Sequence, residues 1–104
     1  MNTLQKIAVL RDMGFVADGT YQESTYFRRD EDGLVARVFD GGAVHMIARV
    51  EVGEDVDEVE FRLRATSNER RVRMYVERLI IESESLRESL SPVRARSERE
   101  RRAA

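Results

Sequence analysis

Residues 43–52 contain the pattern that most restricts the fold of this chain, because their apolar and polar side chains alternate. An alternation with a period of two predicts a β-strand that buries one face of a sheet and exposes the other. The side chains predicted on the buried face are Val44, Met46, Ala48, Val50 and Val52, and those on the exposed face are His45, Ile47, Arg49 and Glu51.

Three further segments have strand composition. Residues 24–29 and 34–39 flank the turn sequence Asp30-Glu31-Asp32-Gly33, and residues 58–65 resume the alternation after a predicted acidic loop at 53–57. Short turns between consecutive strands predict antiparallel neighbours. Residues 15–23 are ambiguous, because the turn dipeptide Asp18-Gly19 between two short apolar stretches fits either a small irregular hairpin or a loop.

Two segments predict helices. Residues 3–13 have an apolar stripe at helical spacing with Thr3 as the expected N-cap; Gly14 ends the helix, and Phe15 should pack back on its last turn. The stripe consists of Leu4, Ile7, Ala8 and Leu10. Residues 67–90 form the longer predicted helix, in which Thr66 and Glu69 have capping-box spacing and Ser67 and Asn68 are rival caps. Its core-facing stripe contains Val72, Tyr75, Val76, Leu79, Leu86 and Leu90, and Ser91-Pro92 ends it.

These elements predict an α+β fold with two layers. An antiparallel sheet of three or four strands packs against the N-terminal helix and the longer C-terminal helix, in the order αβββ(β)α, because the apolar sheet face needs cover and the two helices are the elements that supply it. The 104-residue length fits one domain over residues 1–92. Residues 93–104 form an Arg-rich tail with too little apolar surface to fold on its own.

Composition excludes several classes of site. The chain has no cysteine, which rules out disulfides, zinc–thiolate sites, iron–sulfur clusters and a Cys nucleophile. Its six glycines fall at turns and form no nucleotide-binding loop. There is no secretory leader pattern and no apolar run of the ~20 residues that cross a bilayer. We therefore expect a cytoplasmic protein with no membrane association and no cofactor.

Candidate catalytic and metal-binding residues are few. His45 is the single histidine, and alternation places it on the outer sheet face beside Arg49 and Glu51. A general base needs a nucleophile, and a metal ligand needs further ligands, so we interpret His45 as a surface or partly packed residue. The carboxylates at 30–32 lack the spacing of a calcium loop, and we expect no metal there. We predict that the protein is not an enzyme.

Residues 51–60 contain six carboxylates and no basic residue, in a chain whose first 60 residues carry 6 basic and 13 acidic side chains. A projecting acidic hairpin can imitate a run of phosphates and occupy a basic groove that normally holds nucleic acid. The alternative is a solvated turn whose charges discourage aggregation. Glu54, Asp55 and Asp57 are the predicted partner-binding residues.

Met74 and Ile81 are one heptad apart in the second helix and about 200° around the helical wheel from Leu79. A monomer has no need for an apolar pair there, although isolated exposed apolar residues are common. We predict that these two residues lie on a dimer or partner surface. Direct nucleic-acid binding is not expected, because Glu98 and Glu100 dilute the Arg-rich tail and no aromatic residues separate its arginines.

The overall layout and charge resemble those of small phage-encoded counter-defence proteins, anti-CRISPR proteins among them. The resemblance covers no motif, so it assigns no residue a role. It implies a protein that binds a host defence complex where nucleic acid would otherwise bind.

We therefore expect a small non-enzymatic protein-interaction module, and more specifically an inhibitor that binds a nucleic-acid-handling host complex. The alternative is a small structural or assembly protein that forms homo-oligomers, such as a homodimer, through its second helix. An enzyme whose catalytic residues form no recognisable pattern is the third alternative.

Overall fold

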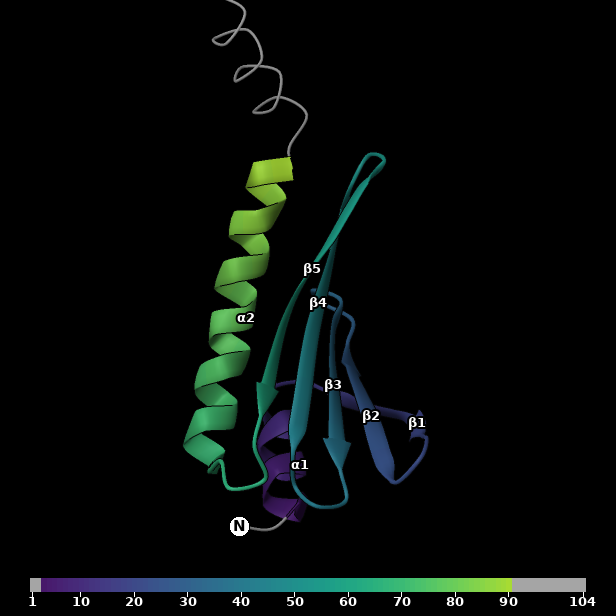
Figure 1. The fold of residues 1–104 in the computed structure, drawn as a ribbon, viewed down its shortest axis with the longest axis vertical. Helices are drawn as coiled ribbons and strands as arrows, with labels where there is room; N and C mark the ends of the chain where they lie inside the picture. Colours follow the sequence, from purple (N-terminus) through teal and green to yellow (C-terminus); the bar gives the residue numbers. More distant parts are fainter. Residues whose placement is uncertain (1–2, 91–104) are drawn as a thin grey trace, which may run out of the picture.

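The computed structural model describes residues 3–90. Their order is one helix, five strands and a second, longer helix, and the five strands form one antiparallel sheet in the order β1-β2-β3-β4-β5 (Figure 1). The elements are α1 (Thr3–Asp12), β1 (Val16–Thr20), β2 (Ser24–Arg29), β3 (Leu34–Phe39), β4 (Val44–Val52), β5 (Asp55–Leu63) and α2 (Glu69–Leu90). The predicted α+β class is confirmed, and the sheet has five strands rather than three or four. The tail at 93–104 and the Ser91-Pro92 helix end lie outside the described residues.

One hydrophobic cluster joins the two helices to one face of the sheet. Leu10 of α1 and Val72, Val76 and Leu79 of α2 pack with the inward-facing residues of the strands, which include Phe27, Leu34, Ala36, Val38, Val44, Met46, Ala48 and Leu63. The residues that alternate with these, such as His45 and Arg37, lie on the other face. The predicted two-layer arrangement is therefore correct, and the alternation in β4 has the predicted phase.

Helix α1 ends as predicted but turns a different side to the core. Gly14 has a φ of +94°, its N–H donates to Arg11 O (3.0 Å), and the N–H of buried Phe15 donates to Leu10 O (3.0 Å), which is the Schellman arrangement. The predicted stripe is wrong at Leu4 and Ala8, which are exposed.

The buried side of α1 consists of Lys6, Val9 and Leu10. The Lys6 ammonium donates to two backbone carbonyls, Gly42 O at 2.6 Å and Ala65 O at 2.8 Å. These bonds connect α1 to the β3–β4 turn and to the β5–α2 connection, and they compensate for burying the amine. Thr3 does not cap the helix; its Oγ1 donates to Asp40 O (3.0 Å) in the β3–β4 turn.

Helix α2 begins two residues later than predicted. Asn68 is the cap, because its Oδ1 accepts from the N–H of Arg71 (2.9 Å) and its carbonyl accepts from the N–H of Val72 (3.2 Å). Thr66 precedes the helix in a turn that the Ser67 N–H closes by donating to Arg64 O (2.9 Å). The rival cap named from the sequence is therefore the one that the structure uses.

Residues 15–23 contain strand β1, which pairs with β2 and ends at a two-residue turn. The turn is Gln22-Glu23, where both φ values are positive (45° and 58°), and Tyr21 and Ser24 exchange backbone hydrogen bonds across it. This geometry matches a type I′ hairpin turn built without glycine. Asp18-Gly19 forms no turn and instead lies where the β1–β2 register shifts.

Candidate functional site

The long hairpin β4–β5 extends beyond the rest of the sheet. Strand β3 pairs with β4 only as far as Ala48, so residues 49–52 pair only with residues 55–58. Figure 1 shows this end of the hairpin projecting past β1–β3, toward the same end of the molecule as the C-terminal end of α2. We call residues 49–58 the acidic arm.

The predicted acidic loop at 53–57 is wrong, because most of it is strand. Val52 pairs with Asp55, which leaves a two-residue turn at Gly53-Glu54. Gly53 has a φ of +61°, and glycine at the first turn position followed by another residue is the sequence signal of a type II′ hairpin. The Gly53-Glu54 dipeptide is visible in the sequence, and a two-residue turn at that position means that β5 begins at Asp55.

The arm carries carboxylates on both faces. Asp55 and Asp57 lie opposite Val52 and Val50, on the same side of the hairpin as the core-facing residues of β4. Glu58 lies opposite Arg49 and Glu51 opposite Val56, on the outer side. The structure therefore places all three predicted residues in the arm, and it adds two that the sequence analysis did not single out, Glu51 and Glu58.

The carboxylates of the arm have few basic partners. Arg49 pairs with Glu51 (Nε–Oε1 3.0 Å), and Asp57 Oδ1 accepts from the N–H of Glu58 (2.8 Å). Within residues 3–90, no ion pair involves Glu54, Asp55, Asp57 or Glu58. All five carboxylates are exposed, so the arm carries a negative field that salt screens over ~8 Å at physiological ionic strength.

Folding gains little from this arrangement. A two-stranded ribbon is marginal in water, and carboxylates that repel one another weaken it further. Near the tip Val56 is 52% exposed, so the outer side also presents an apolar side chain. The arm is suited to noncovalent recognition of a basic surface.

Met74 and Ile81 lie on the side of α2 that faces away from the core, as the wheel predicted. They are 48% and 65% exposed, whereas Val72, Val76 and Leu79 are buried. They belong to a different surface from the acidic arm, because the arm is part of the sheet and they face away from it. Their exposure is confirmed, and their intermolecular role remains a prediction.

The outer sheet face holds His45 in a cross-strand pair with Glu60 (Nε2–Oε2 3.0 Å). Beside it, the Arg37 guanidinium lies 5.1 Å from the ring centre of Tyr26 and 4.5 Å from that of Phe39. His45 is partly packed, as predicted. Its contact with the Glu60 carboxylate and its pairing with the neighbouring strands account for its position.

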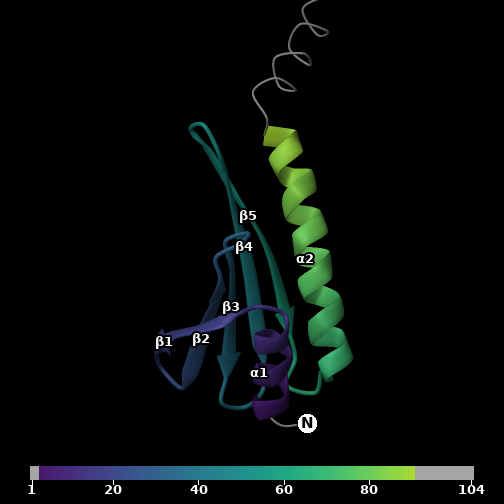
Figure 2. The same ribbon diagram turned by 180° about the vertical axis from the view of Figure 1, so that it is seen from behind.

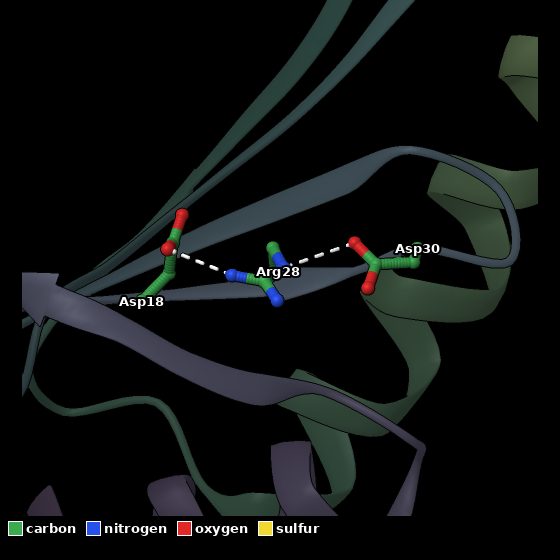
Figure 3. A network of polar contacts seen from close by, with 3 residues as sticks. All are labelled: Asp18, Arg28 and Asp30. Atoms are coloured by element: carbon green, nitrogen blue, oxygen red, sulfur yellow. Dashed lines mark hydrogen bonds and ion pairs between the residues drawn. The ribbon is translucent and has the colours of Figure 1, made fainter.

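The three carboxylates at 30–32 contact neighbouring arginines. Arg28 bridges Asp18 of β1 and Asp30 of the β2–β3 turn, at 2.9 Å and 3.0 Å (Figure 3). The hydrogen bond to Asp30 is the main cause that raises the pKa of the Arg28 guanidinium. Asp32 lies 3.4 Å from Arg29, and its partial burial raises the pKa of its carboxyl. Within the described residues, no three His, Asp or Glu side chains are grouped so as to hold a metal ion.

Neither helix in the described part of the chain is long and apolar enough to cross a membrane. No protein-family model, curated protein sequence or solved structure matches this chain.

Proposed function

We propose that this protein is a non-enzymatic interaction module that binds a positively charged surface of a protein partner through the acidic arm. The observation that carries the proposal is the arm itself: five exposed carboxylates stand on a ribbon that pairs only with itself. Glu54 and Asp55 at its tip have no basic partner within residues 3–90. A basic partner would neutralise charges that the fold leaves uncompensated.

The partner that fits this chemistry best is a host complex that handles nucleic acid. Its phosphate-binding groove is basic, and a narrow ribbon with carboxylates on both faces fits such a groove as a substitute for phosphates. Complementary charge of this kind mainly accelerates association and makes it sensitive to salt. We propose, on that basis, that the protein acts as an inhibitor in the cytoplasm, as a phage-encoded counter-defence protein would.

The test compares two charge-matched variants of the full chain. The arm variant is Glu54→Gln, Asp55→Asn, Asp57→Asn, and the control is Glu77→Gln, Glu84→Gln, Glu88→Gln on α2. Each protein is used to capture partners from host lysate, and the captured protein is then purified for stopped-flow association at several salt concentrations. We expect the arm variant to associate about tenfold more slowly at low salt, with a flatter salt dependence, and the control to match wild type. Equal rates and equal salt slopes for all three would refute the proposal.

A second candidate function is self-assembly through α2. The observation that favours it is the exposure of Met74 and Ile81 one heptad apart on the face opposite the core. In this case the chain would form a tight homo-oligomer, and mass determination in solution at low micromolar concentration would detect it. A monomer under those conditions would remove this candidate and leave the arm as the proposed interaction surface.

A further inference from the structure

The end of β5 opposite the acidic arm leads into a pocket lined by arginines. The pocket has a volume of about 430 Å³ and lies between the last residues of β5, the connection at 64–68 and the first two turns of α2. Arg62, Arg64 and Arg71 line it, together with Ser67 and Tyr75. We call these five residues the arginine pocket. The three arginines come from three different parts of the chain: β5, the connection and α2.

The positive charge of the pocket is poorly compensated by the protein. Within residues 3–90, Arg64 and Arg71 form no ion pair, and the nearest carboxylate to Arg62 is that of Glu60, 3.9 Å away. Two other arginines of α2 are paired more closely, at 2.8 Å for Arg73 with Asp12 and 3.1 Å for Arg78 with Glu82. Two arginines that form no ion pair within the described residues therefore line one pocket, and Arg11, Arg37, Arg70 and Arg87, which also form none there, lie outside it.

Two further features of the pocket suit an anion. Ser67 is a buried polar residue, 9% exposed, that lines the pocket, and its hydroxyl makes no hydrogen bond to another described residue. The pocket also adjoins the N-terminal end of the 22-residue helix α2, where N–H groups and the helix dipole favour negative charge. Glu69, the acidic residue of the first turn, instead lines a separate groove between α1 and α2.

The arginine-lined surface continues across the outer sheet face, where the Glu60 carboxylate lies 3.0 Å from His45 and 3.9 Å from Arg62. A neighbouring pocket of about 320 Å³ shares Arg62 with the first and adds Arg37 and His45. The register pairs Arg37 with His45 and His45 with Arg62, so the three form one row across β3, β4 and β5. Stacking against Tyr26 and Phe39, and a hydrogen bond from its Nε to Ser24 Oγ (2.7 Å), hold the Arg37 guanidinium in place. The row extends the site beyond the size of a single anion.

We infer that the arginine pocket binds phosphate groups, either those of a small ligand such as a nucleotide or those of a nucleic-acid strand. Arginine suits this role because its planar fork of donors matches phosphate oxygens. The inference is independent of the proposed role of the acidic arm, since it concerns other residues at the other end of β5. It also revises the expectation of no direct nucleic-acid binding, which considered only the tail.

The experiment uses the full chain and pyrophosphate as the first probe, with binding measured by calorimetric titration. The variant is Arg64→Gln/Arg71→Gln, and the charge-matched control is Arg11→Gln/Arg87→Gln, whose arginines lie outside the pocket. All four arginines are exposed, so we expect each variant to fold, and a thermal melt checks this. We expect saturable binding that weakens about tenfold or more in the pocket variant and changes less than about twofold in the control.

A second titration distinguishes the two sources of phosphate. A single-stranded oligonucleotide of about ten nucleotides should bind more tightly than pyrophosphate, with a steep salt dependence, if the ligand is a strand. A nucleotide that binds more tightly than the oligonucleotide would assign the site to a small ligand. Absence of saturable binding of all these probes up to about 10 mM, or equal losses in both variants, would overturn the inference. Self-association that only the pocket variant loses, without phosphate binding, would also overturn it in favour of carboxylates from another copy.

Discussion

The two ends of the β4–β5 hairpin have the same backbone pairing and opposite surroundings. At the base, Val44, Met46 and Leu63 are buried beneath the helices. At the tip, Asp55 and Val56 are exposed and the ribbon pairs only with itself. Strands β4 and β5 therefore pair along the whole hairpin, but only the apolar residues at the base contribute to the hydrophobic core. We therefore expect the tip to contribute little to the stability of the fold.

Charge separates the two ends as well. Residues 1–60 carry 6 basic and 13 acidic side chains, a net of −7, whereas residues 61–104 carry 12 and 7, a net of +5. Within the described residues, the acidic arm lies at one end of β5 and the arginine pocket at the other. Some charges of the two halves pair across the fold, as Arg73 does with Asp12 (2.8 Å), whereas Glu54, Asp55, Arg64 and Arg71 form no ion pair within residues 3–90.

The largest effect is expected in the core that supports the hairpin base. Leu79→Ala should lower the free energy of unfolding by about 2–5 kcal/mol, because a fully buried leucine loses transfer energy and leaves a cavity. Glu84→Ala, on the exposed side of the same helix, should change it by less than about 0.5 kcal/mol. Urea unfolding measures both values. Equal effects at the two positions would mean that the phase assigned to α2 is wrong.

A smaller loss is expected at Lys6, which ties α1 to the base of the hairpin. Lys6→Met should cost about 1–3 kcal/mol, because the carbonyls of Gly42 and Ala65 lose their donor. Arg11→Met on the exposed side of α1 is the control and should be close to neutral. If Lys6→Met leaves the free energy of unfolding unchanged, water or a shifted backbone must supply the hydrogen bonds that the ammonium donates.

The Lys6 contribution should also depend on pH in a defined direction. Burial lowers the pKa of Lys6 in the folded protein below its ordinary value of 10.5. Between the lowered pKa of Lys6 in the folded protein and its ordinary pKa in the unfolded chain, the unfolded chain holds the Lys6 proton more tightly. The free energy of unfolding therefore rises with pH across that window. The free energy of unfolding of the wild type minus that of Lys6→Met should therefore increase between neutral pH and pH 10.5. A decrease over the same range would contradict the assigned shift.

On the far side of α2, substitutions should affect association and not folding. Met74→Glu/Ile81→Glu should change the free energy of unfolding by less than about 1 kcal/mol, because both side chains are largely exposed. Analytical ultracentrifugation should show weaker self-association than for wild type. Ser85→Glu/Ser89→Glu adds the same charge to other exposed positions of α2 and serves as the control. Unfolding of the first variant alone would show that a further element covers that face.

The smallest effect on stability is expected at the tip. The arm variant, with Glu54, Asp55 and Asp57 changed to their amides, should match wild type to within about 0.5 kcal/mol in urea unfolding, because these carboxylates lack basic partners in the described chain. Slight stabilisation would agree with relief of repulsion. A loss above about 1 kcal/mol would show that the carboxylates contribute to the fold through contacts other than ion pairs.

The sequence predicted best where a local rule and the tertiary environment agree. Strands 24–29 and 34–39 have the predicted bounds, because glycine-containing turns follow both of them and a strand period fills each segment. Strand β1 was not resolved from a loop, since all five of its residues are exposed and VADGT has no alternation. The predicted apolar stripe of α1 is wrong because a lysine is normally expected on the surface, whereas Lys6 is buried. Its burial depends on hydrogen bonds to the carbonyls of Gly42 and Ala65, which are distant from it in the sequence.

The candidate sites show the same limit. Glu54, Asp55 and Asp57 were found because six carboxylates stand close together in the sequence. Arg62 and Arg71 were not grouped, since each lies on its own element as an ordinary exposed arginine, and only the packing of α2 beside β5 brings them to one pocket. Contiguous charge is visible in a sequence, whereas charge assembled by tertiary structure is not.

Native-state hydrogen exchange tests most directly the claim that the hairpin has a base required for folding and a tip available for binding. The hydrogen-bonded amides of residues 44–48 and 59–63 should exchange only through global unfolding, with opening free energies that fall steeply with denaturant. Those of residues 49–52 and 55–58 should exchange through a local opening of lower free energy that is nearly independent of denaturant. Arm amides that share the opening free energy and denaturant dependence of the base would contradict the account, because the arm would then belong to the same cooperative unit as the core.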